Sequence, residues 1–294
     1  MVEPPKPRER SGYRPEETAL VEAACLTVAV ALGEFLDGLC VVGGLAPVLL
    51  IDRQAHPGPE GEGDTHPGTN DLDIALAIAL LRDGRYTEIS RRLAQEDFRP
   101  DENEQGNATP QRWRLDGLNV TIDFLLPKLP GHPPEQRVQA LDGNFAAFIT
   151  PGLEVAFDER LEVPILGKTL KGEKVERTIP VCGPAAFVLL KALAFNGRGA
   201  NKDAYDLVYV IRRWPAGVAD IADRIANHAE RHPAVTADAL GYLARDFADP
   251  LTIGPLRVVE FEGDVEDPAA AAADAHGHVD DLLRACRRRE LPGL

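Results

Sequence analysis

The sequence predicts an α+β protein, with a mixed sheet and flanking helices first and a mainly helical part after it. Between residues 16 and 182, short apolar runs that are typical of strands alternate with apolar residues at helical spacing. Two extended runs, residues 112–115 and 118–126, are joined by Asp116-Gly117, a dipeptide that strongly favours a β-hairpin. After residue 182 helical spacing dominates. A chain of 294 residues that is 44% apolar can bury the cores of two modest domains.

We expect three regions along the chain. Residues 1–15 are charged and proline-rich and lack the apolar stretch of a signal peptide, so they are predicted to be a mobile leader. Residues 16–182 then form the α+β domain, and residues 183–294 form the mainly helical C-terminal domain. No segment is apolar enough to span a bilayer, and no C-x-x-C pair indicates disulfides or a zinc site. These features favour a cytoplasmic protein without a membrane partner.

The spacing of apolar residues predicts the elements of the first domain. Helical spacing predicts helices over residues 15–36, 45–51 and 85–96. Apolar or alternating runs predict strands over residues 39–42, 71–78 and the two arms of the hairpin, with further short β-like pieces within residues 157–182. Residues 52–69 have no periodicity and predict a long surface loop, in which His56 and His66 are expected to be exposed.

Three carboxylates are predicted to converge on one face of the sheet. Asp71 and Asp73 are two residues apart on a strand, so their side chains leave one face while Leu72 and Ile74 point to the other. Asp123 is opposed in the same way to its apolar neighbours. If the two strands are adjacent, a divalent cation relieves the repulsion among the acids, and oxygen-only ligands suit Mg²⁺ or Mn²⁺. The alternative for a D-x-D pair is a solvated position at a loop edge.

A glycine turn upstream of these acids supports a site for nucleotide phosphates. Gly43 and Gly44 end the first strand, and Pro47 suits the first turn of the helix that follows. Glycine permits close approach of a ligand to the backbone, and a helix N-terminus attracts anions. We therefore expect Gly43 and Gly44 to offer backbone N–H groups to a triphosphate.

This order of a Gly-Gly turn, a D-x-D strand and a third strand carboxylate resembles the DNA polymerase beta-like nucleotidyltransferases. Within that superfamily the chain is similar to the AbiEii/MenT group of toxin nucleotidyltransferases. Two segments carry the similarity: Thr69 to Ile74, and Lys191 followed by Lys202-Asp203-Ala-Tyr-Asp206-Leu207. The resemblance spans residues 41–210 and implies the polymerase beta-like fold, with Thr69 at the nucleotide. The loop between Gly44 and Asp71 is longer than is usual in the superfamily.

The resemblance also assigns roles to a second group of residues. Lys191 interrupts an apolar helix face, so it either extends its ammonium to solvent or, as the resemblance implies, binds nucleotide phosphates. Asp203 and Asp206 share a helix face, either as an acid pair favoured by the helix N-terminus or, by resemblance, as catalytic residues that orient the acceptor or a base. Arg198, in the glycine-bearing loop before that helix, is a further candidate phosphate ligand.

The implied reaction is in-line attack of an acceptor hydroxyl on the α-phosphate of an NTP, with pyrophosphate leaving. Asp71 and Asp73 would hold the metal and the triphosphate, while Asp123 would bind metal nearer the acceptor and help to deprotonate it. The resemblance implies that the acceptor is the 3′ end of tRNA. It further implies a toxin that is controlled by a cognate antitoxin protein.

The charge of the chain leaves other acceptors open. A formal net charge of −15 repels nucleic acid, so RNA would have to bind a small basic patch. The candidates for this patch are Arg112 and Arg114 on the hairpin, together with Arg198 and the run from Arg287 to Arg289. One alternative is nucleotide transfer to a protein or a small molecule, which the acidic charge favours. The other is a nucleotide-binding module without catalytic activity.

Overall fold

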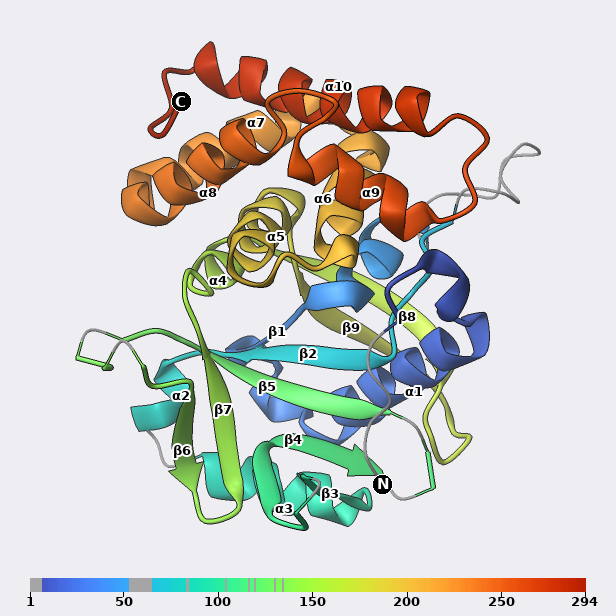
Figure 1. Cartoon of the computed structure of the whole chain (residues 1–294). Helices are drawn as coiled ribbons and strands as arrows, with labels where there is room; N and C mark the ends of the chain where they lie inside the picture. Colours follow the sequence, from blue (N-terminus) through green and yellow to red (C-terminus); the bar gives the residue numbers. More distant parts are fainter. Residues whose placement is uncertain are drawn as a thin grey trace. The chain divides into compact units, whose positions relative to one another are not determined.

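The computed structural model describes residues 7–52, 65–82, 85–103, 105–115, 117–118, 120–129, 131–133 and 135–294 (Figure 1). The chain divides into two compact units. The first, which we call the sheet unit, contains Arg14–Ala46 and Gly68–Cys182. The second, the helical unit, contains Pro7–Tyr13, the described parts of Pro47–Pro67, and Gly183–Leu294.

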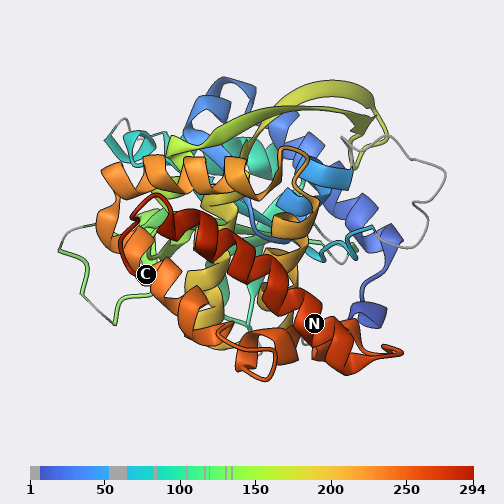
Figure 2. The same ribbon diagram turned by 90° about the horizontal axis from the view of Figure 1, so that it is seen from above.

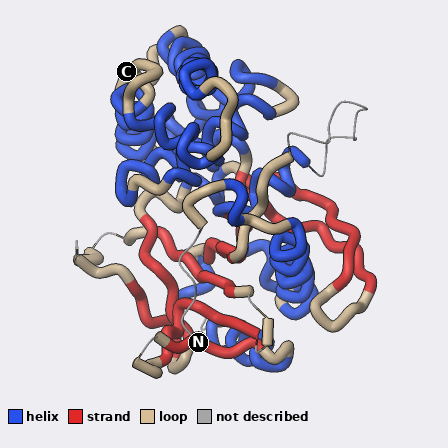
Figure 3. Tube along the Cα trace, turned by 45° about the vertical axis from the view of Figure 1, so that its right-hand side comes forward, coloured by secondary structure: helices blue, strands red, loops and turns tan. Residues whose placement is uncertain are grey.

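The prediction of an α+β protein with a mixed sheet and C-terminal helices is confirmed. The strands are β1 (Leu39–Val42), β2 (Asp71–Leu76), β3 (Phe98–Glu102), β4 (Ala108–Leu115), β5 (Thr121–Pro127), β6 (Val138–Asp142), β7 (Phe145–Thr150), β8 (Arg160–Lys168) and β9 (Lys174–Cys182). They form one sheet in the order β3-β4-β5-β2-β1-β9-β8, to which β7 is attached through β5, and β6 through β7. Figure 3 shows the strands in red. The β2–β5, β1–β9 and β5–β7 pairs are parallel, and the other pairs are antiparallel.

Apolar and aromatic side chains form the core of the sheet unit. Helix α1 (Pro15–Ala31) packs on β2, β8 and β9, and helix α3 (Tyr86–Gln95) packs on β3, β6 and β7; the short helices α2 (Ala79–Arg82) and α4 (Val155–Asp158) complete the unit. An aromatic cluster fixes the hairpin of β4 and β5 against β7, because the Phe145 ring lies 4.8 Å from Phe124 and 5.9 Å from Trp113. Tyr86 of α3 contacts the same ring.

The helical unit is built on α5 (Pro184–Arg198), α6 (Asn201–Arg213), α7 (Gly217–Arg231), α8 (Pro233–Asp246), α9 (Ile253–Glu262) and α10 (Pro268–Arg287). Proline stands in the first turn of α5, α8 and α10, where its missing N–H is not needed. Gly199 ends α5 in the left-handed conformation, with φ of 61°. Helix α10 lies across its neighbours and packs on α6, α7, α8 and α9 (Figure 2).

We expected residues 1–15 to form a mobile leader, but residues 7–13 belong to the helical unit. Arg10 donates hydrogen bonds to the Tyr205 hydroxyl at 3.0 Å and to the Thr65 carbonyl at 2.7 Å. The Tyr13 ring is 9% exposed and lies 5.8 Å from Phe261. These contacts join residues that are far apart in sequence, so local composition does not predict them.

Several expected elements have different bounds. The first helix ends at Ala31 and is followed by a 3₁₀ segment, Gly33–Gly38. The hairpin of β4 and β5 is confirmed, but its connection spans residues 116–120 and is not a two-residue turn. The pieces expected within residues 157–182 are one hairpin of β8 and β9, with Gly167 inside β8. His56 and most of the long loop lie outside the described residues.

Within the described ranges, no helix has the length and apolar character needed to cross a membrane.

Candidate metal centre

The register of the sheet brings the three predicted carboxylates together. On the parallel strands β2 and β5, Asp73 stands opposite Asp123, and Asp71 stands two positions before Asp73 on the same face. The other face of these strands carries Leu72, Ile74 and their apolar partners, which are buried in the core. The face that holds the acids is thus set by the same alternation that builds the core.

The geometry of this group suits a divalent cation. One carboxylate oxygen from each of Asp71, Asp73 and Asp123 lies within 4.8 Å of the others. Asp71 and Asp123 are 4% and 6% exposed, so water screens their repulsion poorly. All three offer hard oxygen ligands, the type that Mg²⁺ and Ca²⁺ prefer. The group can therefore hold a metal ion, as the sequence predicted.

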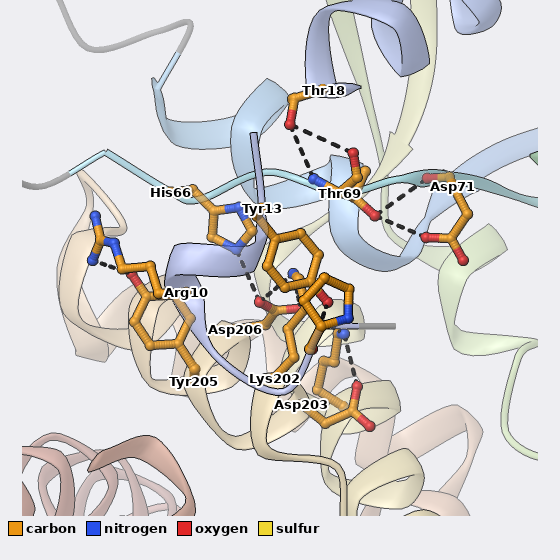
Figure 4. Close-up of polar contacts among 12 residues, drawn as sticks. Arg10, Tyr13, Thr18, His66, Thr69, Asp71, Lys202, Asp203, Tyr205 and Asp206 are labelled. Carbon is orange, nitrogen blue, oxygen red and sulfur yellow. Dashed lines mark hydrogen bonds and ion pairs between the residues drawn. The ribbon is translucent and has the colours of Figure 1, made fainter. Parts of the chain in front are cut away.

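Thr69 orients the first of these carboxylates. Its hydroxyl donates a hydrogen bond of 2.8 Å to Asp71 Oδ1, and its side chain is buried (Figure 4). The Thr69 N–H in turn donates to the Thr18 hydroxyl of α1 at 3.2 Å. The Thr69 hydroxyl is thus bonded to a candidate metal ligand, and its expected contact with the nucleotide stays a prediction.

The glycine turn lies directly against the second carboxylate. Gly43 has φ of 67°, and a Cβ atom built on it would stand 1.9 Å from Asp73 Oδ2. Any side chain at this position would clash and would also strain the backbone. Gly44, which is buried, follows in the 3₁₀ turn Gly43–Leu45. The turn therefore brings bare backbone next to the acids, as a site for phosphate groups requires.

Arg112 is a member of this site that sequence reasoning placed elsewhere. It stands opposite Asp123 on the neighbouring strand β4 and donates from Nε to Oδ1 at 2.6 Å and from a terminal nitrogen to Oδ2 at 2.7 Å. Arg114, the other candidate for an RNA-binding patch, pairs with Asp101 at 3.0 Å. Both guanidinium groups thus already hold carboxylates of the sheet unit. Alternation along the hairpin could have placed Arg112 on the same face as Asp123, but the predicted two-residue turn would have paired Arg112 with Thr121.

The second predicted group lies in the helical unit, where it forms a buried ionic cluster. Lys191 Nζ donates to Asp203 Oδ1 at 2.9 Å and to Asp206 Oδ2 at 2.7 Å. Lys202 Nζ donates to both oxygens of Asp206, at 2.7 and 2.9 Å (Figure 4). The Lys191 side chain is 9% exposed, so it does not extend to solvent. The Arg198 guanidinium caps the cluster with two bonds to Asp203, at 2.6 and 2.8 Å.

Ion pairing within the cluster outweighs burial for Lys191 and Asp206, whereas burial lowers the pKa of Lys202. Burial opposes charge on the Lys191 ammonium, but the Asp203 and Asp206 carboxylates outweigh it and raise its pKa. Burial likewise opposes ionisation of Asp206, but the neighbouring Lys191 and Lys202 ammonium groups hold its pKa well below the usual range. Two lysines and two aspartates thus compensate one another, with Arg198 at the margin.

His66 joins this cluster from the end of the long loop. Its Nε2 lies 2.9 Å from Asp206 Oδ1, and its side chain is buried rather than exposed as we had expected (Figure 4). Because the ionised Asp206 only accepts hydrogen bonds, His66 carries its proton on Nε2. The backbone N–H of His66 donates to the Asp52 carboxylate at 3.0 Å, and this carboxylate also accepts a hydrogen bond from the Tyr209 hydroxyl. Both described ends of the loop are therefore attached to α6.

His66 is expected to make the protein sensitive to mild acid. Burial and the Lys202 ammonium lower its pKa to about 4, and Asp206 only partly opposes this. The unfolded chain takes up this proton near pH 6.5, so stability falls as the pH drops from 6.5 towards 4. The loss should be on the order of 3 kcal/mol. Chemical denaturation of wild type and His66→Gln across this range measures it; His278→Gln, a partly exposed histidine on α10, is the control. Equal pH dependence in wild type and His66→Gln would contradict the assignment.

No protein-family model matches the chain, and no curated protein matches it in sequence.

Proposed function

We propose that this protein is a metal-dependent nucleotidyltransferase with a polymerase beta-like catalytic core in the sheet unit. The observation that carries the proposal is the convergence of Asp71, Asp73 and Asp123 on one face of the sheet, within 4.8 Å. The order of the features along the chain also supports it. Strand β1 leads into the turn at Gly43, β2 carries the first two acids, and β5 carries the third.

The three carboxylates would hold Mg²⁺, or Mn²⁺, together with the triphosphate of an NTP. The bound ion would neutralise phosphate charge and make the acceptor hydroxyl more acidic. Asp71, oriented by Thr69, and Asp73 would fix the triphosphate, while the turn at Gly43 lets its phosphates approach the backbone. Asp123 would face the acceptor and take part in removing its proton.

We further propose that the NMP is transferred to the 3′ end of tRNA and that the protein acts as the toxin of a toxin–antitoxin pair. This proposal rests on the sequence resemblance from Thr69 to Ile74 and from Lys191 to Leu207. By the same resemblance, Lys191 would bind nucleotide phosphates, and Asp203 and Asp206 would orient the acceptor or a general base. The Arg198 side chain is 61% exposed, so its guanidinium is the most accessible cation of the ionic cluster. Arg198 is therefore a further candidate phosphate ligand.

A protein or small-molecule acceptor is the second candidate. It is favoured by the pairing of Arg112 with Asp123 and of Arg114 with Asp101, which leaves the hairpin without a ready basic patch for RNA. The net charge of −15 acts in the same direction.

Label transfer from NTPs tests the proposal and separates the candidates. Each of the four α-³²P-labelled NTPs is incubated with the protein, Mg²⁺, and either total RNA or total protein. We expect label in the small-RNA fraction with the wild-type protein and none with Asp73→Asn. Label in the protein fraction would support the second candidate. NTP binding without transfer to any acceptor would identify a non-catalytic nucleotide-binding module.

A further inference from the structure

Arg112 makes the closest described contact to a candidate metal ligand from a neighbouring strand. Its two bonds to Asp123, of 2.6 and 2.7 Å, use both carboxylate oxygens. The Asp123 side chain is 8% exposed and that of Arg112 is 22% exposed, so the pair is largely shielded from water. Parallel N–H···O bonds of this kind are stronger than single bonds and fix the orientation of both groups.

Asp123 therefore serves two cationic partners. One is Arg112, on β4, and the other is the divalent cation that Asp71, Asp73 and Asp123 would share. The guanidinium occupies a lone pair on each Asp123 oxygen, and two cations near one carboxylate repel each other. Counting these four side chains, the three acids and the arginine leave a formal charge of −2, which a divalent cation would balance.

We propose that Arg112 and the divalent cation compete for the Asp123 carboxylate. Arg112 is thus a positioning residue: it holds Asp123 on the acidic face before the cation binds, and it lowers the affinity of the site for the cation. The inference rests on the proposed function only through the metal site, because it concerns binding of the ion and not transfer.

The sign of one effect separates this role from a purely structural one. If Arg112 only kept Asp123 in place, its removal would disorder a metal ligand and weaken cation binding. If Arg112 competes, its removal frees both Asp123 oxygens for the ion and removes a positive charge beside it, and binding becomes tighter. The gain should be at least about tenfold, because a buried positive charge next to the ion is removed.

Titration of Mn²⁺ into the nucleotide-free protein, followed by electron paramagnetic resonance, measures this affinity. We expect Arg112→Met to bind Mn²⁺ at least about tenfold more tightly than wild type. Arg177→Met removes the same charge from an exposed position on β9 of the same unit, and it should stay within about twofold. If Arg112→Met does not fold, Arg112→Gln keeps a neutral donor towards Asp123 and should show the same direction. Asp73→Asn should bind weakly.

The outcomes separate the inference from the proposed function. Unchanged or weaker Mn²⁺ binding by Arg112→Met, beside normal binding by wild type, would overturn the competition and leave the metal site intact. An equal gain in Arg112→Met and Arg177→Met would reduce the effect to net charge and overturn it too. Failure of wild type and every variant to bind Mn²⁺ would overturn both the competition and the proposed function.

Discussion

Asp73→Asn is expected to slow nucleotide transfer by at least about 1,000-fold while the protein stays folded. Asparagine keeps the size of the side chain but removes the charge that would hold the cation and the triphosphate. Loss of such a ligand costs several kcal/mol in the transition state, and about 4 kcal/mol corresponds to this change in rate. Transfer kinetics measure the effect, and circular dichroism reports the fold. Asp71→Asn should behave in the same way.

Stability provides an independent readout of the same site. Without metal, Asp73→Asn should hold or raise the thermal midpoint, because it removes one of several mutually repelling charges. Asp123→Asn should lower it, because Arg112 loses its carboxylate partner. Asp142→Asn, at an exposed end of β6, is the matched control and should change neither activity nor midpoint. Full activity in both Asp71→Asn and Asp73→Asn would refute the metal assignment.

Lys191→Met is expected to lower the free energy of unfolding by about 3–5 kcal/mol, the usual cost of breaking a buried ion pair from one side. The substitution leaves Asp203 and Asp206, which are 1% and 0% exposed, without a cation that each of them contacts. Urea denaturation measures the change. Lys174→Met, on the exposed end of β9, removes the same charge and should cost less than about 0.5 kcal/mol.

A double variant tests whether this cost belongs to the ion pair. Lys191→Met combined with Asp203→Asn removes both charges. Arg198, the other partner of Asp203, is 61% exposed and can be solvated, and Asp206 keeps its two bonds from Lys202. The double variant should therefore be more stable than the sum of the single effects predicts. A Lys191→Met protein that keeps its stability but shows a raised KM for NTP would instead favour direct phosphate binding by Lys191.

The sequence predicted the carboxylate strands because a buried strand has a simple signature. Alternation of acids with Leu72 and Ile74 required one polar face, and parallel pairing of β2 with β5 put Asp123 on that face. The same alternation applied to the hairpin puts Arg112 on the face of Asp123, although the predicted two-residue turn pairs Arg112 with Thr121 and not with Asp123. We instead assigned Arg112 to a basic patch for RNA, because arginines on a strand suggested an exposed surface and not an ion pair within the sheet.

Other features had no local signature. Strand β3 contains Pro100 and several charged residues, a composition that is more typical of a loop. It lies at the edge of the sheet, where proline is tolerated. Strand β6 is short, and none of its residues is buried. His66 lies among glycine and proline residues that predict an exposed loop, and its burial depends on Asp206, 140 residues later. The Lys191 charge was visible in an apolar face, but its two partners lie on the next helix.

Because β2 pairs with β5 in parallel, the acidic site can form only after a long stretch of chain has been synthesised. Asp73 and Asp123 stand side by side in the sheet although 50 residues separate them in the chain. The ribosome therefore completes β2 well before it adds Asp123. A tight turn cannot join two parallel strands, so β2 must wait for the longer connection that leads to β5. On the proposed function, a nascent chain has no complete cation site until β5 has docked. Because the ion binds the closed sheet and not the open chain, cellular Mg²⁺ would further stabilise the pairing of β2 with β5 once both strands have been synthesised.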